Sequence, residues 1–178
     1  TEFRTGPDNI PLAAIVASAS GTVTASTTGE GLPRITVEAL RTNADGELMS
    51  IASAATDDTG VYQLPSLVPG TYKLRFTAAG FNEVWYVDGE GRDTVSLAPL
   101  QTRDGLDVVM VGEPGSLSGS IAIPPGSEGV PLTVTAVQVV ETSDPDAPAP
   151  VEVQQVTTDG TVDLQGLPTP ATYRVTVT

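Results

Sequence analysis

The chain has 178 residues and a formal net charge of −14, and it contains neither cysteine nor histidine. The commonest general base, thiolate metal ligands and Ser-His or Cys-His nucleophile pairs are therefore excluded. An acidic surface of this size repels nucleic-acid phosphates and anionic lipid headgroups, and no run of about 18 apolar residues is present to span a bilayer. We expect neither nucleic-acid binding nor membrane insertion.

Alternating apolar and polar residues predict β-strands in the first half of the chain. In "RITVEAL" the inward-facing residues are expected to be Ile35, Val37 and Ala39. In "TYKLRF" the corresponding positions are Tyr72, Leu74 and Phe76. Clusters of Asn, Asp and Gly, as in "NADG" at 43–46 and "TDDTG" at 56–60, predict tight turns between the strands.

The second half follows the same rule. Leu132, Val134 and Ala136 alternate with threonines, and the last strand places Tyr173, Val175 and Val177 on its inward side. No segment sustains a helical apolar period without interruption by Gly, Pro or β-branched residues. The predicted class is all-β.

Several landmarks recur in the same order about a hundred residues apart, which indicates an internal repeat. "SGTV" at 20–23 matches "SGSI" at 118–121, and Tyr72 matches Tyr173. Gly60, Leu64 and Leu67 likewise match Gly160, Leu164 and Leu167. We therefore predict two β-sandwich modules, at residues 18–112 and 113–178.

A third, partial copy is predicted at the front of the chain. "DNIPLAAIVASASGTV", from Asp8, lines up with "DGLDVVMVGEPGSLSGSI", from Asp104, so residues 1–17 are expected to be the tail strand of a preceding module or an extra N-terminal strand. Module two ends after "TYRVTVT" and lacks counterparts of "EVWYVDGEGRDTVSL" and "GLDVVMV". It is either cut at a chain boundary, or it has an open edge that accepts an N-terminal strand from a neighbouring copy.

The pattern "SGTVT…LPRITVEAL…ATDDTGVYQLPSLVPGTYKLRFTAAGF" resembles the carboxypeptidase regulatory-like domain. That domain is a relative of the Cna B-type and transthyretin-like modules repeated in bacterial surface proteins. The resemblance implies two tandem antiparallel Greek-key β-sandwiches of transthyretin-like or Ig-like type, the second one incomplete. Within the motif, Pro69 and Gly70 suit a turn that sends Tyr72 into the core, where its hydroxyl needs a backbone partner.

Acidic residues in turns are the candidate metal ligands, because calcium binds carboxylate and carbonyl oxygens. These candidates are Asp57, Asp58, Asp104 and Asp107. The alternative is that these acids serve their own turns. No other cofactor is expected.

Adjacent residues of a strand face opposite sides, so Trp85 or Tyr86 is expected to be partly exposed. An exposed aromatic side chain could contact a sugar ring or a protein, whereas a buried Trp85 would pack against the neighbouring module. The proline-rich segment "TSDPDAPAP" is predicted to be an exposed hairpin loop, and its residues 143–150 are a second candidate contact surface.

With no catalytic residues identified, the chain is predicted not to be an enzyme. The resemblance implies a structural or adhesive stalk module of a bacterial surface or secreted protein, located outside the cell. Its partners would be neighbouring modules. The alternatives are a module that binds carbohydrate or matrix protein, and an accessory domain of a secreted hydrolase.

Overall fold

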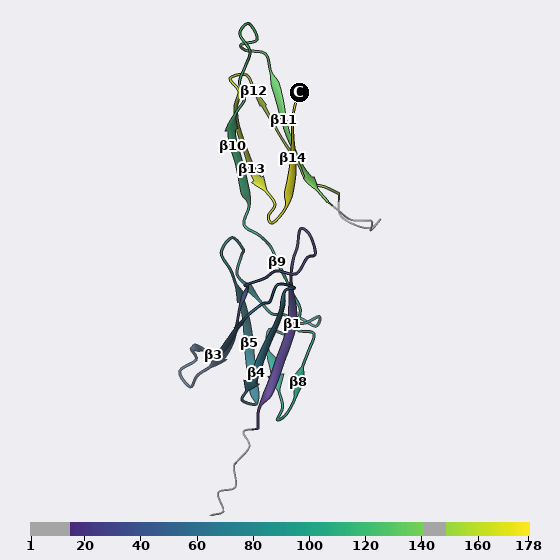
Figure 1. The fold of residues 1–178 in the computed structure, drawn as a ribbon. Coiled ribbons are helices and arrows are strands. Elements are labelled where there is room, and N and C mark those ends of the chain that lie inside the picture. The colour runs from purple at the N-terminus through teal and green to yellow at the C-terminus, as the bar shows by residue number, and fades with distance from the viewer. Residues whose placement is uncertain (1–14, 141–148) are drawn as a thin grey trace, which may run out of the picture.

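The computed structural model describes residues 15–140 and 149–178. All regular structure in these residues is β-strand, and within them no helix is long and apolar enough to cross a membrane. Two bodies lie end to end (Figure 1). We call residues 15–112 the first unit and the described residues after 112 the second unit. The predicted tail strand at 1–17 lies outside the described residues up to position 14, and Ala17 begins the first strand.

The first unit is a sandwich of two sheets. One sheet has the order β4-β1-β8, with β9 also paired to β1; the other has the order β3-β2-β5-β6, with β7 also paired to β5. Its strands are β1 (Ala17–Ala25), β2 (Thr36–Thr42), β3 (Leu48–Ala55), β4 (Val61–Leu67), β5 (Gly70–Thr77), β6 (Val84–Trp85), β7 (Val95–Leu97), β8 (Thr102–Arg103) and β9 (Val108–Met110). Strands β8 and β9 run parallel to β1, beside otherwise antiparallel ladders.

The second unit repeats the first five strands in the same arrangement. Strand β10 pairs with β13, and β11 lies between β12 and β14. The strands are β10 (Gly115–Ser120), β11 (Leu132–Val139), β12 (Glu152–Thr157), β13 (Thr161–Leu167) and β14 (Thr172–Val177). The fold is thus all-β, with two Greek-key sandwiches of which the second is incomplete within the described residues.

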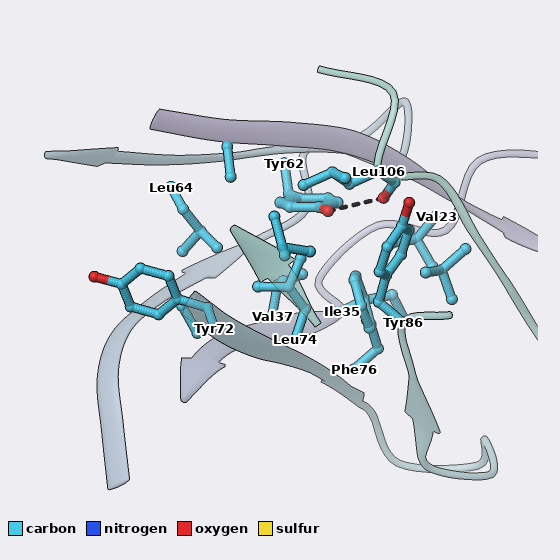
Figure 2. Packing of buried hydrophobic residues seen from close by; sticks show 14 of the residues in the cluster. Val23, Ile35, Val37, Tyr62, Leu64, Tyr72, Leu74, Phe76, Tyr86 and Leu106 are labelled. Atoms are coloured by element: carbon cyan, nitrogen blue, oxygen red, sulfur yellow. Dashed lines mark hydrogen bonds between the residues drawn. The ribbon is translucent and has the colours of Figure 1, made fainter. Parts of the chain in front are cut away.

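The core of the first unit lies between its two sheets (Figure 2). The Tyr62 ring meets the Phe76 ring edge-on at 5.5 Å between centroids, and the Tyr62 hydroxyl donates to the Leu106 carbonyl at 2.8 Å. Burial raises the pKa of Tyr62, so this hydroxyl remains a donor. The segment before β9 is therefore tied to the core by a side chain from β4.

The inward positions predicted for the first unit are confirmed: Ile35, Val37, Ala39, Tyr72, Leu74 and Phe76 are all buried. In the second unit Val134 and Ala136 are buried as predicted, whereas Leu132 is only half-buried. The prediction for β14 is wrong, because Val175 and Val177 are 44% and 45% exposed. They face the correct side, but no described strand covers them.

Two landmarks of the sequence repeat have the same geometry in both units. Val23 N donates to Gly60 O at 2.9 Å, and Ile121 N donates to Gly160 O at 2.8 Å. The Tyr72 hydroxyl donates to Val68 O at 2.5 Å, and the Tyr173 hydroxyl to Pro168 O at 2.7 Å. The predicted backbone partner of each tyrosine is confirmed, although the Tyr173 ring is only half-buried.

Candidate functional site

Trp85 ends β6 and Tyr86 directly follows it, and the two side chains face opposite sides of the sheet, as expected for neighbours in extended chain. Tyr86 is buried in the core of the first unit, and its amide donates to Leu74 O at 3.0 Å. Trp85 is half-buried on the outer face, opposite Arg75 of β5. Of the two, only Trp85 remains a candidate contact residue.

Arg75 covers part of the Trp85 ring. Its guanidinium carbon is 5.8 Å from the ring centroid, and the indole N–H donates to Glu83 at 2.8 Å. The same guanidinium donates to Glu38 from Nε at 3.0 Å and from a terminal nitrogen at 2.5 Å. The hydrogen bond from Arg75 lowers the pKa of Glu38, so the pair stays charged at neutral pH. Trp85 is thus held in place by Arg75 and Glu83 of its own unit.

The four calcium candidates lie in two places, Asp57 and Asp58 in the turn before β4, and Asp104 and Asp107 in the segment between β8 and β9. Asp57 accepts hydrogen bonds from the Thr59 amide and hydroxyl and from the Val61 amide, at 2.9, 2.7 and 3.0 Å. These bonds, the Thr59 hydroxyl foremost, lower the pKa of Asp57. Its neighbour Asp58 is exposed in the same turn.

The other two acids bind β1. Asp104 accepts from the Ser20 hydroxyl at 2.6 Å, and Asp107 accepts from the Thr22 amide at 2.8 Å. Among the described residues, no three Asp or Glu side chains converge in a group that could hold a metal ion. Asp57, Asp104 and Asp107 therefore accept hydrogen bonds from their own turn or from β1.

Between the two units lies a junction formed by the linker between β9 and β10. Its linker is fixed to the first unit, because Glu113 N donates to Gly80 O at 2.8 Å and Asn82 N donates to Val111 O at 3.0 Å. From the second unit, the Thr169 hydroxyl donates to Glu113 O at 2.6 Å. The linker between β9 and β10 is therefore bonded on both sides.

Two further contacts cross the junction. The Thr27 hydroxyl of the first unit donates to Pro170 O of the second at 2.6 Å. Gly112 is buried, and a Cβ at this position would lie 2.0 Å from the Thr169 carbonyl oxygen. The backbones can approach this closely only because residue 112 is glycine. Sequence reasoning found the short linker but had no signal for Thr27 or Thr169, which are 142 positions apart.

A hollow of about 530 Å³ opens beside this junction, lined by Thr27, Thr28, Glu30, Gln138, Pro170 and Thr172 among others. Its walls combine polar side chains, three threonines with Glu30 and Gln138, with the apolar Val139, Val140, Pro170 and Ala171. They offer hydrogen bonds but no pair of acids with a nucleophile. The candidate loop at 143–150 lies outside the described residues up to position 148.

Among solved structures, the chain is similar to three bacterial proteins. One is a type II cohesin–X-dockerin complex from Acetivibrio cellulolyticus, at 19% identity over 60% of this chain and 61% of that one, with a TM-score of 0.39. Another is the Bacillus anthracis TIE protein, at 15% identity over 91% of this chain and 28% of that one, with a TM-score of 0.48. The third is BcpA, the major pilin subunit of Bacillus cereus, at 13% identity over 84% of this chain and 56% of that one, with a TM-score of 0.38.

A comparison with curated protein sequences found no match. The sequence profile of the carboxypeptidase regulatory-like domain, by contrast, matches residues 18–111. These residues include all nine strands of the first unit except the first residue of β1. Through them, the chain belongs to the carboxypeptidase regulatory-like domain family.

Proposed function

We propose that the chain is a non-catalytic structural module of a bacterial surface or secreted protein, which acts outside the cell as a spacer or adhesive segment. The observation that carries this proposal is the bonded junction between the units. Hydrogen bonds from Thr27 to Pro170 and from Glu113 to Gly80 cross it, and the close approach of Gly112 to Thr169 leaves little room for rotation. A spacer needs this property, since a flexible linker would not fix the distance between its ends. The division into modules at 18–112 and 113–178 is part of the proposal.

How rigidly the junction holds the two units can be tested by measuring the distribution of distances between them. Because the chain lacks cysteine, single spin labels can be placed at Gly89→Cys and Val156→Cys, one in each unit and both exposed. We expect a narrow distribution of label-to-label distances in pulsed electron resonance. Thr27→Val with Thr169→Val should broaden it, whereas Thr94→Val, away from the junction, should not. A broad distribution in the unaltered junction would contradict the spacer proposal.

Contact with carbohydrate or matrix protein through Trp85 is the second candidate, and it is favoured by the half-exposed indole on the outer sheet face. Trp85 is the only tryptophan, so fluorescence reports on it alone. We expect a ligand to shift or quench this emission, and Arg75→Ala, which uncovers the ring, to change the affinity. A flat titration with polysaccharides and matrix proteins would eliminate this candidate.

A further inference from the structure

The second unit has an open groove where the first unit is filled. In the first unit, Leu106, Val108 and Met110 enter the core beside β1, and all three are buried. In the second unit, strand β10 takes the place of β1, and among the described residues it pairs with β13 alone. Leu117 of β10 is 40% exposed, whereas the equivalent Ala19 is 2% exposed. One edge of β10 and part of the core beside it are therefore uncovered.

Strand β10 has a glycine at the position where, in β1, a neighbouring backbone comes too close for any side chain. In β1, Gly21 lies so close to the segment before β9 that a Cβ would be 2.3 Å from Leu106 O. The equivalent residue in β10 is Gly119, and no described atom lies within 4 Å of the place where its Cβ would be. Glycine inside a strand weakens it and often marks a close approach by another backbone. Gly119 thus preserves a cradle for a strand that the described residues do not supply.

The chain itself contains a segment with the sequence of the missing strand. Residues 8–16, "DNIPLAAIV", align with residues 104–112, "DGLDVVMVG", and both lead directly into the first strand of a unit. The buried positions Leu106, Val108 and Met110 correspond to Ile10, Leu12 and Ala14, which are all apolar. The period of two is therefore retained over the whole segment.

Pro11 is compatible with this register. It corresponds to Asp107, whose neighbour Leu106 donates its amide to Ser20 O at 3.1 Å. Amides one residue apart in a strand point in opposite directions, so the amide at position 107 points away from β1. A proline there forfeits no hydrogen bond to the acceptor strand.

We propose that residues 8–16 of one copy of this chain insert beside β10 of a second copy and complete its second unit as a donated strand. Insertion within one chain is excluded by distance. Ala14 is one peptide step from Ile15, which precedes the start of β1, whereas the contact from Thr27 to Pro170 places the other end of β1 at the second unit. Nine residues of strand separate these ends by about 30 Å, far more than one step of about 3.8 Å.

The assembly that follows is head-to-tail. The donor segment continues straight into β1, as residues 104–112 continue into β10, so each added copy would stack on the last in the way that the two units stack in Figure 1. Such a contact leaves a free groove at one end and a free donor at the other, and it gives rise to linear oligomers. The inference goes beyond the spacer role, which rests on the junction within one chain and does not depend on self-association.

Charge should set the salt dependence of this assembly. Each copy carries −14, yet residues 9–16 and 115–125 contain no charged side chain. The contact itself is therefore apolar, while the chains as a whole repel each other. Because salt screens that repulsion, we expect association to strengthen as salt is raised.

The test is the mass of the full chain by sedimentation velocity, up to about 1 mM protein. We expect a ladder of oligomers. Leu12→Asp, at the position equivalent to buried Val108, should abolish the ladder; Ala13→Asp, equivalent to the 58% exposed Val109, is the matched control and should retain it. Gly119→Val should also abolish it by filling the cradle, while Gly89→Val, at another open glycine, should not.

A cross-link fixes the register. Thr24 pairs with Val109 in the first unit, and the equivalent residues are Ala122 and Ala13. Mixing Ala13→Cys chains with Ala122→Cys chains under oxidation should yield the mixed disulfide dimer in several-fold excess over either homodimer. A monomer at every concentration and salt would overturn the proposal. So would oligomers that persist in both Leu12→Asp and Gly119→Val, because they would form through another surface, such as the free edge of β3 or β14.

Discussion

The second unit repeats the arrangement of the first five strands of the first unit, but among the described residues fewer strands cover its core. Strands β5 and β14 occupy equivalent places, each paired to the central strand of its sheet. Phe76 is opposite Val37 as Val177 is opposite Val134, and Leu74 is opposite Ala39 as Val175 is opposite Ala136. Leu74 and Phe76 of β5 are at most 1% exposed, whereas their equivalents Val175 and Val177 of β14 are nearly half exposed. The first unit owes this difference to residues 84–110, which add strands to both of its sheets.

The comparison also indicates how the second unit avoids buried polar groups without that cover. In the first unit the Tyr62 hydroxyl needs the Leu106 carbonyl. The equivalent position in β13 is Val162, which has no hydroxyl to satisfy. Within the described residues, no buried side-chain nitrogen or oxygen lacks a hydrogen-bond partner. The second unit therefore loses folding free energy mainly through exposed apolar area. This loss is small per side chain compared with the cost of an unpaired buried polar group.

The largest effect is expected from truncating equivalent residues of β5 and β14. Phe76→Ala should destabilise the first unit by about 3–5 kcal/mol, because it leaves a cavity in a closed core. Val177→Ala should cost less than about 1 kcal/mol, because the side chain is already in water. Urea unfolding can follow both, with Trp85 fluorescence for the first unit and circular dichroism for the second. Equal losses would mean that the groove is covered in solution.

Replacing the strand glycines Gly21 and Gly119 should again destabilise the first unit more than the second. Gly21→Ala should destabilise the first unit by about 1–3 kcal/mol, since the Leu106 backbone must move away. Gly119→Ala should be neutral or stabilise the second unit by up to about 1 kcal/mol, because alanine restricts the unfolded chain more than glycine does. Both effects can be measured as shifts of the urea midpoint at low protein concentration. A strongly destabilised Gly119→Ala monomer would show that this site is not open.

A smaller effect is expected from acid, in both units alike. Hydrogen bonds lower the pKa of Asp57 in the first unit, chiefly that from the Thr59 hydroxyl, and of Asp159 in the second, chiefly that from the Thr161 amide. Because each folded-state pKa lies below the ordinary value of 3.8, the stability from these carboxylates is complete above that value and is lost as pH falls through the folded-state pKa.

Melting curves between about pH 5 and pH 2.5 test this sign. Asp57→Asn and Asp159→Asn keep an acceptor oxygen in the turn, so each should flatten the acid loss of stability in its own unit. Asp58→Asn, in the same turn as Asp57, controls for the change in net charge. An acid slope that is unchanged in both variants would contradict the role assigned to these turns.

The smallest effect is expected from calcium. Asp57, Asp104 and Asp107 already accept hydrogen bonds from neighbouring groups, and they lie in separate turns and strand ends. We expect millimolar calcium to shift the melting temperature of either unit by less than about 1 °C. A larger shift, abolished by Asp57→Asn or Asp104→Asn, would restore the prediction of a calcium site.

The strands, the turns and the repeat could be predicted from the amino-acid sequence. Alternation with period two predicted which side each residue faces, also in β14, where the expected burial was wrong. Asn, Asp and Gly marked the turns because their backbone and side-chain hydrogen bonding is local. The turns that precede Tyr72 and Tyr173 were predicted from the same short motif. The site was less predictable: of the two aromatic candidates, the strand pattern could not say which would be exposed.

Which of the inward faces are covered could not be predicted from the sequence. Whether Phe76 or Val177 is buried depends on strands contributed from distant positions, and the pattern within a strand contains no information about them. The parallel pairing of β8 and β9 with β1, and the contact from Thr27 to Pro170, likewise join residues some 85 and 143 positions apart. Local sequence sets the direction of a side chain, but burial requires a second surface, and that surface is supplied by the fold.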